Sequence, residues 1–558
     1  MTQKYKELSK EQLVEIIERL KDQKKYGIVW EEEKIREIFE SDSDNAISIL
    51  KQISSKEIRK DEQLPWNIMI EGDNYHSLSV LNYTHESKID LIYIDPPYNT
   101  GAKNWKYNND YVDESDTYRH SKWLSMMSKR LRLAKNLLTE NGVLICAIDE
   151  NEVTRLGLLL EEIFSSKEIH LITIVHNPRG IQGKNFSYTN EFAYFVLPKN
   201  KKIIQNRKID AENIDWRNLR DNGGESLRQD AKNCFYPIIV EDEKIIGFGD
   251  VCETEFHPKK QSIKDDNKYY IYPIDRNKVE RKWRYARQSV ESILKLLRVK
   301  KNKDNYEIEI GKDFGTYPTV WQNAKYDSNE YGKKIIGTLV PNSSFDYPKS
   351  VYNVYDCLHS VVGSNKNAVV LDFFAGSGTT AHAVLMLNKS DGGRRQFILC
   401  TNNENEIAET VCYPRIKSVI FGNLSYPEIT GIKANLKYYK TSFVKKTLNK
   451  DLLKIRVTQE CTEMLCMNEK IYDEIKKTDD FRIFKNNNRF MGIYYSLDYA
   501  KLDFLKIELS KLIGEKILYC FTLDPLGLDK NDFEDWINVE LKDVPQKILD
   551  IYEIINEY

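Results

Sequence analysis

The sequence predicts an α/β protein with an open, doubly wound and mainly parallel sheet, whose strands come from two stretches that lie far apart in the chain. Two motifs carry this prediction. Residues 91–101, LIYIDPPYNTG, lead an apolar strand directly into an acid and two prolines, and residues 369–380, VVLDFFAGSGTT, lead a second strand into a glycine loop. The intervening stretch is much longer than a βα connection requires, so it predicts an inserted domain.

The first motif begins with four consecutive apolar residues bounded by turn chemistry, a pattern typical of a strand buried on both faces. Pro96 and Pro97 then hold the chain stiff and extended. Because ligands of open α/β sheets bind outside the carboxyl ends of the strands, the turn is placed for chemistry. Its alternative interpretation is an ordinary strand-ending turn. The predicted catalytic residues are Asp95, Pro96, Pro97 and Tyr98.

The second motif predicts a strand ending at Asp372, a tight turn at Gly376 and Gly378, and a helix that begins near Thr379 or Thr380. Such a unit places a ligand at a helix N-terminus. It lacks the lysine of a P-loop and the third glycine of the dinucleotide pattern, which disfavours a nucleoside triphosphate. A turn of small residues used only for packing is the alternative.

Three further strands complete the expected sheet. Residues 67–72 form strand 3, residues 142–149 strand 5, and residues 395–400 strand 2, where Asn402 and Glu404 follow as candidate ribose contacts. A helix is expected from about residue 117 to 138. In the order 3-2-1-4-5, strands 1 and 4 are neighbours, so the two motifs should face each other.

The remaining segments define the predicted domains. We expect an N-terminal helical extension (1–60), two halves of the core (61–198 and 319–438), an inserted domain (199–318) and a small C-terminal α/β or α+β domain (439–558). The polar loop 99–116 resembles a mobile lid. The lysine-rich residues 295–303 favour a solvated amphipathic helix. The inserted domain carries candidate DNA-binding side chains, namely Arg217, Arg220, Arg228, Arg281, Lys282, Arg284 and Arg287.

Composition limits the classes of function. The chain has 558 residues, of which 30% are charged, contains no run of eighteen apolar residues, and begins with charged rather than signal-like residues, so we expect a cytoplasmic protein. A net charge of −2 argues against general coating of nucleic acid but permits a local basic groove. The nine cysteines are scattered without a C-x-x-C pair, which predicts reduced thiols and no metal site.

The two motifs together resemble the amino-methyltransferases that move a methyl group from S-adenosylmethionine to an exocyclic nitrogen of a DNA base. Their permuted order is similar to the β class of N6-adenine enzymes, and most closely to the modification (Mod) subunits of Type III restriction systems and their orphan relatives. Three further stretches support the resemblance, namely FDYPK at 345–349, TNEFAYF at 189–195 and WRNLRDNGG at 216–224. The resemblance runs from about residue 27 to the C-terminus.

The resemblance implies a circularly permuted, Rossmann-like methyltransferase fold with an inserted target-recognition domain. It also implies double-stranded DNA as substrate, a homodimer, a possible restriction (Res) subunit as partner, and a prokaryotic cell with nucleoid-associated DNA. The C-terminal domain would contribute DNA or subunit contacts. The implied cofactor-binding residues are Asp372, Phe373, Ala375, Gly376, Ser377, Gly378, Phe345, Lys349, Asp73, Asn402 and Glu404.

The chemistry of the proposed reaction agrees with the first motif. The exocyclic amine of adenine is a poor nucleophile, and acceptors at Asp95 and at the carbonyl of Pro96 would draw its lone pair toward the methyl donor. Tyr98 offers an aromatic face to a base rotated out of the duplex. Three alternatives stay open: N4-cytosine methylation, whose enzymes more often resemble S-P-P-Y, methylation of structured RNA, and a catalytically silent DNA-binding regulator with a methyltransferase fold.

Overall fold

The computed structural model describes residues 9, 10, 14, 30, 45–107, 110–209, 211–302, 305–341, 343, 345, 347–423, 426–524 and 526–556. The chain forms two compact units, one of residues 1–203 and 318–558 and the other of residues 204–317. The insertion predicted at 199–318 therefore corresponds to a unit whose limits lie a few residues inside that range. Most of the predicted N-terminal helical extension lies outside the described residues.

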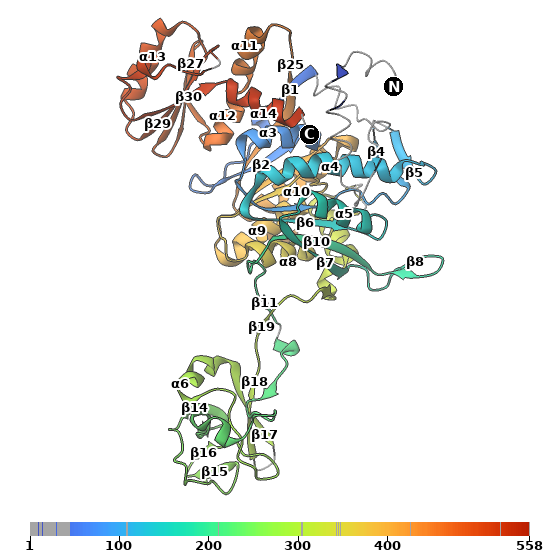
Figure 1. The fold of residues 1–558 in the computed structure, drawn as a ribbon, viewed down its shortest axis with the longest axis vertical. Coiled ribbons are helices and arrows are strands. Elements are labelled where there is room, and N and C mark those ends of the chain that lie inside the picture. The colour runs from blue at the N-terminus through green and yellow to red at the C-terminus, as the bar shows by residue number, and fades with distance from the viewer. Residues whose placement is uncertain are drawn as a thin grey trace. The chain divides into compact units, whose positions relative to one another are not determined.

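The larger unit is built on a ten-stranded sheet with the order β1-β25-β2-β22-β21-β3-β6-β10-β7-β20 (Figure 1). Its strands are β1 (Ala46–Gln52), β25 (Asn435–Lys445), β2 (Trp66–Glu71), β22 (Gln396–Thr401), β21 (Val369–Asp372), β3 (Ile89–Ile94), β6 (Leu138–Ile148), β10 (Asn190–Pro198), β7 (Lys167–Val175) and β20 (Val320–Trp321). The central run β2-β22-β21-β3-β6 is parallel throughout. It is the predicted order 3-2-1-4-5, which confirms the doubly wound, permuted fold class.

Two groups of helices accompany this sheet. The first comprises α3 (Asn74–Thr84), α4 (Arg119–Leu137) and α5 (Val153–Ile163), and the second α7 (Lys334–Leu339), α8 (Val351–Val362), α9 (Thr379–Asp391) and α10 (Tyr413–Phe421). Figure 1 shows the sheet between α4 and α9. The helices predicted near residues 117–138 and from residue 379 are confirmed.

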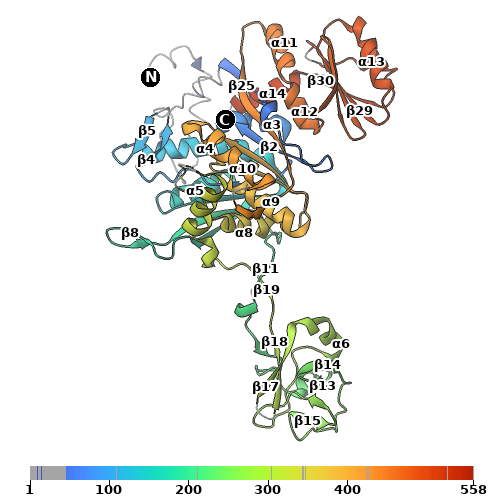
Figure 2. The same ribbon diagram turned by 180° about the vertical axis from the view of Figure 1, so that it is seen from behind.

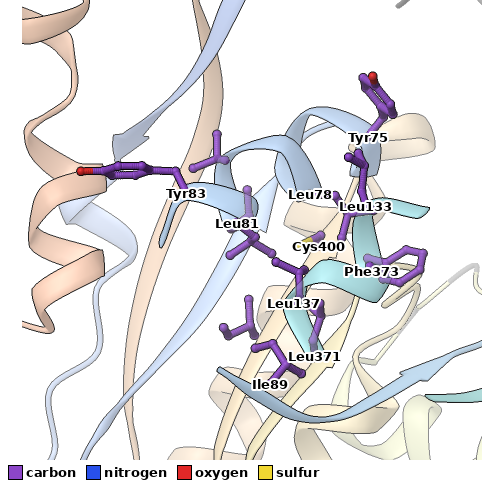
Figure 3. Packing of buried hydrophobic residues seen from close by; sticks show 14 of the residues in the cluster. Tyr75, Leu78, Leu81, Tyr83, Ile89, Leu133, Leu137, Leu371, Phe373 and Cys400 are labelled. Carbon is purple, nitrogen blue, oxygen red and sulfur yellow. The ribbon is translucent and has the colours of Figure 1, made fainter. Parts of the chain in front are cut away.

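The core of this unit is continuous from the sheet into the first helix group. Leu78 and Leu81 of α3, Leu137 of α4 and Leu371 of β21 are at most 1% exposed and pack together, as Figure 3 shows. Central parallel strands are covered on both faces, which explains why their sequences are continuous apolar runs rather than alternating ones.

The sheet extends further than predicted on one edge. Residues 46–52, expected in a helical extension, instead form β1, which pairs antiparallel with β25, and β25 also pairs parallel with β2. Residues 47–50 of this strand are all buried, so side chains on both of its faces are covered.

The C-terminal residues pack on this sheet rather than apart from it. They form α11 (Lys450–Glu460), α12 (Thr462–Glu469), a five-stranded sheet of β26 (Asp473–Lys477), β27 (Phe481–Asn486), β28 (Arg489–Tyr494), β29 (Glu515–Phe521) and β30 (Val539–Val544), and the helices α13 (Leu502–Ser510) and α14 (Gln546–Asn556). The buried Tyr552 hydroxyl of α14 donates to the Ser48 carbonyl of β1 at 2.5 Å. The α+β content agrees with expectation. These residues enclose a small hydrophobic core of their own, and α14 also packs into the core of the ten-stranded sheet.

Two short hairpins belong to the same unit. Within the polar stretch 99–116, β4 (Ala102–Tyr107) pairs with β5 (Asp110–Asp113). Between β7 and β10, β8 (Ile181–Gln182) pairs with β9 (Ser187–Tyr188). A further pair, β23 (Gly422–Asn423) and β24 (Tyr426–Thr430), follows α10.

The smaller unit is mainly β. It contains a four-stranded sheet of β13 (Ile238–Glu241), β14 (Lys244–Phe248), β15 (Ser262–Asp265) and β16 (Lys268–Ile271), a three-stranded sheet of β12 (Arg217–Asn218), β17 (Leu297–Asn302) and β18 (Asn305–Ile310), the pair β11 (Arg207–Lys208) and β19 (Phe314–Gly315), and the short helix α6 (Arg287–Val290). The helix expected over 295–303 is wrong, because residues 297–302 form β17, and Glu309 of β18 pairs with Arg298 and Lys300.

Truncation of the shared core should destabilise the larger unit. Leu81→Ala removes a fully buried side chain at the centre of α3, and such changes cost about 2–5 kcal/mol. We expect a lower urea midpoint of the corresponding transition, measured by circular dichroism. Leu158→Ala in α5 is the matched control, since Leu158 is 47% exposed and its loss should change stability by less than about 0.5 kcal/mol. Equal effects of the two variants would contradict this assignment of the core.

Candidate functional site

The two sequence motifs meet at one edge of the sheet. Val370 of β21 lies opposite Leu91 of β3, and Leu371 lies opposite Ile92. Because the strands are parallel and adjacent, Asp372 and Asp95 both follow the carboxyl end of their strands on the same side of the sheet. The register therefore places the two carboxyls at neighbouring positions of this edge.

A buried cation lies beside Asp95. The Nζ atom of Lys349 is 3.3 Å from Asp95 Oδ1 and also contacts Glu191 Oε2 and the Tyr98 hydroxyl. Its ammonium is 4.6 Å from the centroid of the Tyr98 ring. The Tyr98 hydroxyl donates to Glu191 at 3.3 Å, and Asn353 Nδ2 of α8 donates to the second Glu191 oxygen at 3.0 Å. Five side chains from four segments thus form one network.

Burial and charge set the protonation of this network. Burial raises the pKa of Asp95, and the charge of Glu191 raises it further, against the attraction of Lys349. Burial also acts against ionisation of Glu191 and Lys349, but the attraction of Lys349 lowers the pKa of Glu191, and the attraction of Asp95 and Glu191 raises the pKa of Lys349. The ionised Lys349–Glu191 pair is therefore stable. Of the two carboxyls, Asp95 is the one that is protonated more readily.

Hydrogen bonds from neighbouring residues fix the turn that follows Asp95. The indole Nε1 of Trp123 in α4 donates to the Pro97 carbonyl at 2.6 Å. Asn99 is buried in a left-handed conformation with φ of 58°, and its amide donates to Glu152 Oε1 at 2.5 Å. The same Glu152 oxygen lies 2.5 Å from His120 Nδ1. These contacts fix the rigid Pro96–Tyr98 segment against the helices and leave Asp95 facing Lys349.

The glycine loop is closely packed on its inner side. Gly376 and Gly378 have φ of 50° and 76°, which side chains other than glycine rarely adopt. Ser377 lies between them with its hydroxyl accepting from the buried Arg415 at 2.9 Å, and Arg415 also donates to Thr379 at 2.7 Å. Two nitrogens of Arg415, Nε and Nη2, have no hydrogen-bond partner within the described residues.

Asp372 turns its carboxylate into this loop. It accepts from the Phe374 amide at 2.9 Å and from the Thr380 hydroxyl at 2.5 Å. Burial, against these two hydrogen bonds, raises its pKa to about 7. Asp372 therefore holds its proton up to near neutral pH, and a nearby cation would favour its ionised form.

The residues predicted around the cofactor also gather at this edge. Asp73 caps α3 by accepting from the Tyr75 amide at 2.7 Å, and its neighbour Asn74 donates to the Phe373 carbonyl of the glycine loop at 2.9 Å. Asn402 follows β22 and its side chain accepts from the Glu404 amide at 3.4 Å. Phe345 reaches the loop as well, because a Cβ added to Gly376 would lie 3.6 Å from its ring.

Four predicted cofactor residues have different surroundings from those expected. Lys349 faces Asp95 and Glu191 rather than the glycine loop. The Phe373 ring is fully buried in the hydrophobic core, as Figure 3 shows, and the Ser377 hydroxyl is bonded to Arg415. Ala375 is buried and its amide donates to the Cys400 carbonyl at 3.2 Å. Local spacing placed these residues correctly along the chain but could not show where their side chains point.

Sequence reasoning missed several members of the network. Glu191 lies within the TNEFAYF stretch, but one acid in a strand has no periodic signal. Asn353, Trp123 and Arg415 lie on helices whose apolar spacing alone was informative, and Glu152 directly precedes α5. Their shared property is burial of a polar group, which is visible only in three dimensions.

In the smaller unit, the structure accounts for most of the predicted DNA-binding arginines by internal contacts. Arg220 is 6% exposed and donates to the Ile274 carbonyl at 2.5 Å, which contradicts its prediction as a DNA contact. Arg228 donates to the Glu253 and Phe256 carbonyls, Arg281 to Asp275 and Ser226, and Arg287 to the Phe248 and Gly249 carbonyls. Arg217 and Arg284 have the more exposed side chains, 73% and 45%, and Lys282 is half-buried.

Comparison with known proteins agrees with this geometry. A family model for N6 and N4 methylases, described as DNA methylase, matches residues 89–411, which is more than half of the chain. The chain belongs to this DNA methylase family. The matched range includes both motifs and the residues between them, so the resemblance inferred from the sequence is confirmed.

Three curated relatives of this DNA methylase are similar over about two thirds of its length. The Type III restriction-modification enzyme EcoPI Mod subunit of Escherichia phage P1 is 29% identical over 62% of this chain and 58% of its own. The StyLTI Mod subunit of Salmonella typhimurium is 30% identical over 66% and 57%, and the Type II methyltransferase M.KpnI of Klebsiella pneumoniae is 29% identical over 64% and 86%. The matched region thus spans less than two thirds of each of the two Mod subunits.

Among the described residues, no helix is both long and apolar enough to cross a membrane.

The raised pKa of Asp372 predicts a pH-dependent cost to stability. A carboxyl whose folded pKa is about 7 loses stability as pH rises from its unfolded value near 4 through 7, because the folded state holds the proton more tightly. Asp372→Asn removes this titration. We expect the free energy of unfolding of the variant, relative to the wild type, to increase by roughly 2–3 kcal/mol between pH 5 and pH 8. Urea unfolding at both pH values measures this, and a constant difference would contradict the buried, protonated state.

Proposed function

We propose that this DNA methylase is a site-specific DNA methyltransferase that transfers a methyl group from S-adenosylmethionine to N6 of an adenine rotated out of the duplex. One observation carries the proposal. The segment 345–349 contacts both motifs, since the Phe345 ring lies against the glycine loop while Lys349 lies against Asp95. A methyl donor bound at the glycine loop and a target base bound at Asp95 would therefore lie next to each other.

The loop fits the cofactor on physical grounds. S-adenosylmethionine supplies an electrophilic methyl group on a sulfonium, and it carries a second positive charge on its amino group. Asp372 is a buried carboxyl whose ionised form a nearby cation would favour, and the conformations of Gly376 and Gly378 keep the backbone free of side chains at a helix N-terminus. Asp73, Asn402 and Glu404 lie at the adjacent strand ends, where the ribose and the adenine of the cofactor would be held.

On the base side, Asp95 and the Pro96 carbonyl would accept the two N6 hydrogens and draw the nitrogen toward a tetrahedral geometry. Lys349 favours the ionised form of Asp95, and Glu191 and Asn353 fix Lys349 in turn. The Tyr98 ring, with one side against the Lys349 ammonium, would stack on the base with its other face. These groups act by orientation and electrostatics and form no covalent intermediate.

Adenine is favoured over cytosine because the motif begins with an acid, whereas N4-cytosine enzymes more often resemble S-P-P-Y. The names of two relatives describe them as Mod subunits of Type III restriction-modification enzymes. By this similarity we propose double-stranded DNA as substrate, a homodimer, a possible Res subunit as partner and a cytoplasmic location. Arg217, Lys282 and Arg284 are the proposed DNA contacts of the smaller unit.

The direct test uses labelled S-adenosylmethionine with genomic duplex DNA that lacks the modification, and with structured RNA. We expect label in DNA, recovered as N6-methyldeoxyadenosine after digestion to nucleosides, and single-molecule sequencing of the product would give the modified site. Recovery of N4-methyldeoxycytidine, or label in RNA alone, would replace the proposal with one of its alternatives. Cofactor binding without transfer to any nucleic acid would favour the silent regulator.

Substitution of Asp95 should separate its hydrogen bonding from its charge. We expect Asp95→Ala to lower the methylation rate by about 10³-fold, because a group that stabilises the transition state is lost. Asp95→Asn keeps one acceptor oxygen and should retain more activity than the alanine variant. Rates from single-turnover assays with saturating cofactor measure both. Asp503→Ala, in the exposed first turn of α13, is the control, and an alanine variant as active as this control would refute the assignment of Asp95.

Lys349 should control the pH at which Asp95 becomes active. Its positive charge lowers the pKa of Asp95, so Lys349→Met should raise that pKa further and shift the acidic limb of the pH–rate profile to higher pH. The maximal rate should also fall, because Tyr98 and Glu191 lose their shared partner. The exposed Lys202→Met is the matched control. A lowered rate with an unshifted acidic limb would mean that Lys349 acts only on structure.

A further inference from the structure

A two-stranded finger beside the catalytic network has no role in the chemistry described above. It comprises residues 177–190 between β7 and β10, and its strands pair with Ile181 opposite Tyr188 and Gln182 opposite Ser187. Figures 1 and 2 both show it projecting from the larger unit at the label β8.

The register of the sheet places the root of this finger at the catalytic edge. Phe192 of β10 lies opposite Ile148, the last residue of β6, and Cys146 of β6 lies opposite Ile94 of β3, directly before Asp95. Since β10 runs antiparallel to β6, its beginning lies beyond the carboxyl ends of the parallel strands. Glu191 is therefore at the level of the network, and the finger continues outward from it on the side from which a substrate arrives.

The finger has the composition of a nucleic-acid contact. Phe186 is 77% exposed and Tyr188 is 46% exposed, although burying such a side chain is worth about 1.5–3 kcal/mol. Arg179 and Lys184 are exposed on the same finger, and residues 177–190 contain no acid. Aromatic rings can stack on bases, and the cations beside them can bind the flanking phosphates. This composition therefore suits a nucleic acid better than the apolar surface of a protein.

The conformation of the tip is fixed by its own backbone. Gly180 has a left-handed backbone with φ of 73°, and its amide donates to the Asn177 carbonyl at 2.8 Å. The Gly183 amide donates to the Phe186 carbonyl at 2.9 Å. At the root, the amides of His176 and Asn177 both donate to the Thr189 carbonyl at 3.2 Å. Phe186 is thus presented on a preorganised ribbon, which lowers the entropic cost of binding.

We propose that this finger enters the major groove of the DNA beside the target adenine and that Phe186 wedges into the base stack as the adenine rotates out. A two-stranded ribbon fits the major groove, and an aromatic side chain that stacks on the exposed bases offsets part of the cost of unstacking them. Phe186 lies five positions before Glu191, about 16 Å of extended strand, so the tip reaches the duplex while the network holds the extruded base. Arg179 and Lys184 contact the flanking phosphates. This inference rests on the proposed methyltransferase function.

The test compares Phe186→Ala with the wild type on two short duplexes that carry the methylated site found by sequencing. In one the target adenine faces thymine, and in the other it faces an abasic position, where extrusion costs little. We expect kcat/KM of the variant to fall roughly 10- to 100-fold on the paired duplex and to return to within about threefold of the wild type on the abasic one. Phe504→Ala on α13, where Phe504 is 64% exposed, should match the wild type on both.

Other outcomes would refute the proposed insertion of Phe186 into the base stack. An unchanged variant on the paired duplex, or an equal loss on both duplexes, would mean that Phe186 does not assist extrusion. Unchanged methylation together with an altered oligomeric state would assign the tip to contact with a second copy of the chain. In all three cases the wild type still methylates DNA, so the proposed function stands. A wild type inactive on both duplexes and on genomic DNA would instead refute the proposed function itself.

Discussion

The parallel pairing of β3 with β21 is the constraint on which the rest of the structure depends. These strands are separated by more than 270 residues along the chain, yet their backbones are adjacent, with Val370 opposite Leu91. This backbone pairing places Asp95 and Asp372 at the same edge of the sheet. A doubly wound sheet places its ligands at such a switch point because the flanking helices diverge there. The compact insertion and the helices between the two strands leave this pairing intact.

Around Asp95, one ammonium is shared by two carboxylates and a phenol. Burying such charges is expensive, and the cost is tolerated only where every partner is positioned. Here Lys349 arrives from the segment before α8, Glu191 from β10, Asn353 from α8 and Tyr98 from the turn after β3. Their common location explains why a ten-stranded sheet, rather than a local motif, is needed to build the site. It also explains why Glu191 forms a physical link between this network and the finger that continues from the same strand.

Arginine was the residue type whose role the sequence indicated least well. Arg220, Arg228 and Arg287 donate to backbone carbonyls of the smaller unit, and so satisfy acceptors that its short strands and irregular loops leave outside the ladders. A guanidinium serves equally well for this purpose and for binding phosphate, since both supply oxygen acceptors. Composition alone therefore could not distinguish structural arginines from those available to DNA. The burial of Arg220 made that distinction.

The sequence by itself determined the order of the five central strands, the approximate ends of α4, the beginning of α9, and the positions of Asp95, Tyr98 and the glycine loop, because continuous apolar runs, prolines and glycines act through local backbone physics. It did not determine β1, the packing of the C-terminal residues on the core, or the partners of Lys349. Those features depend on contacts between residues hundreds of positions apart, such as Tyr552 with Ser48 and Lys349 with Asp95. Only the tertiary structure decided them, since burial of a polar group has no periodicity along the chain.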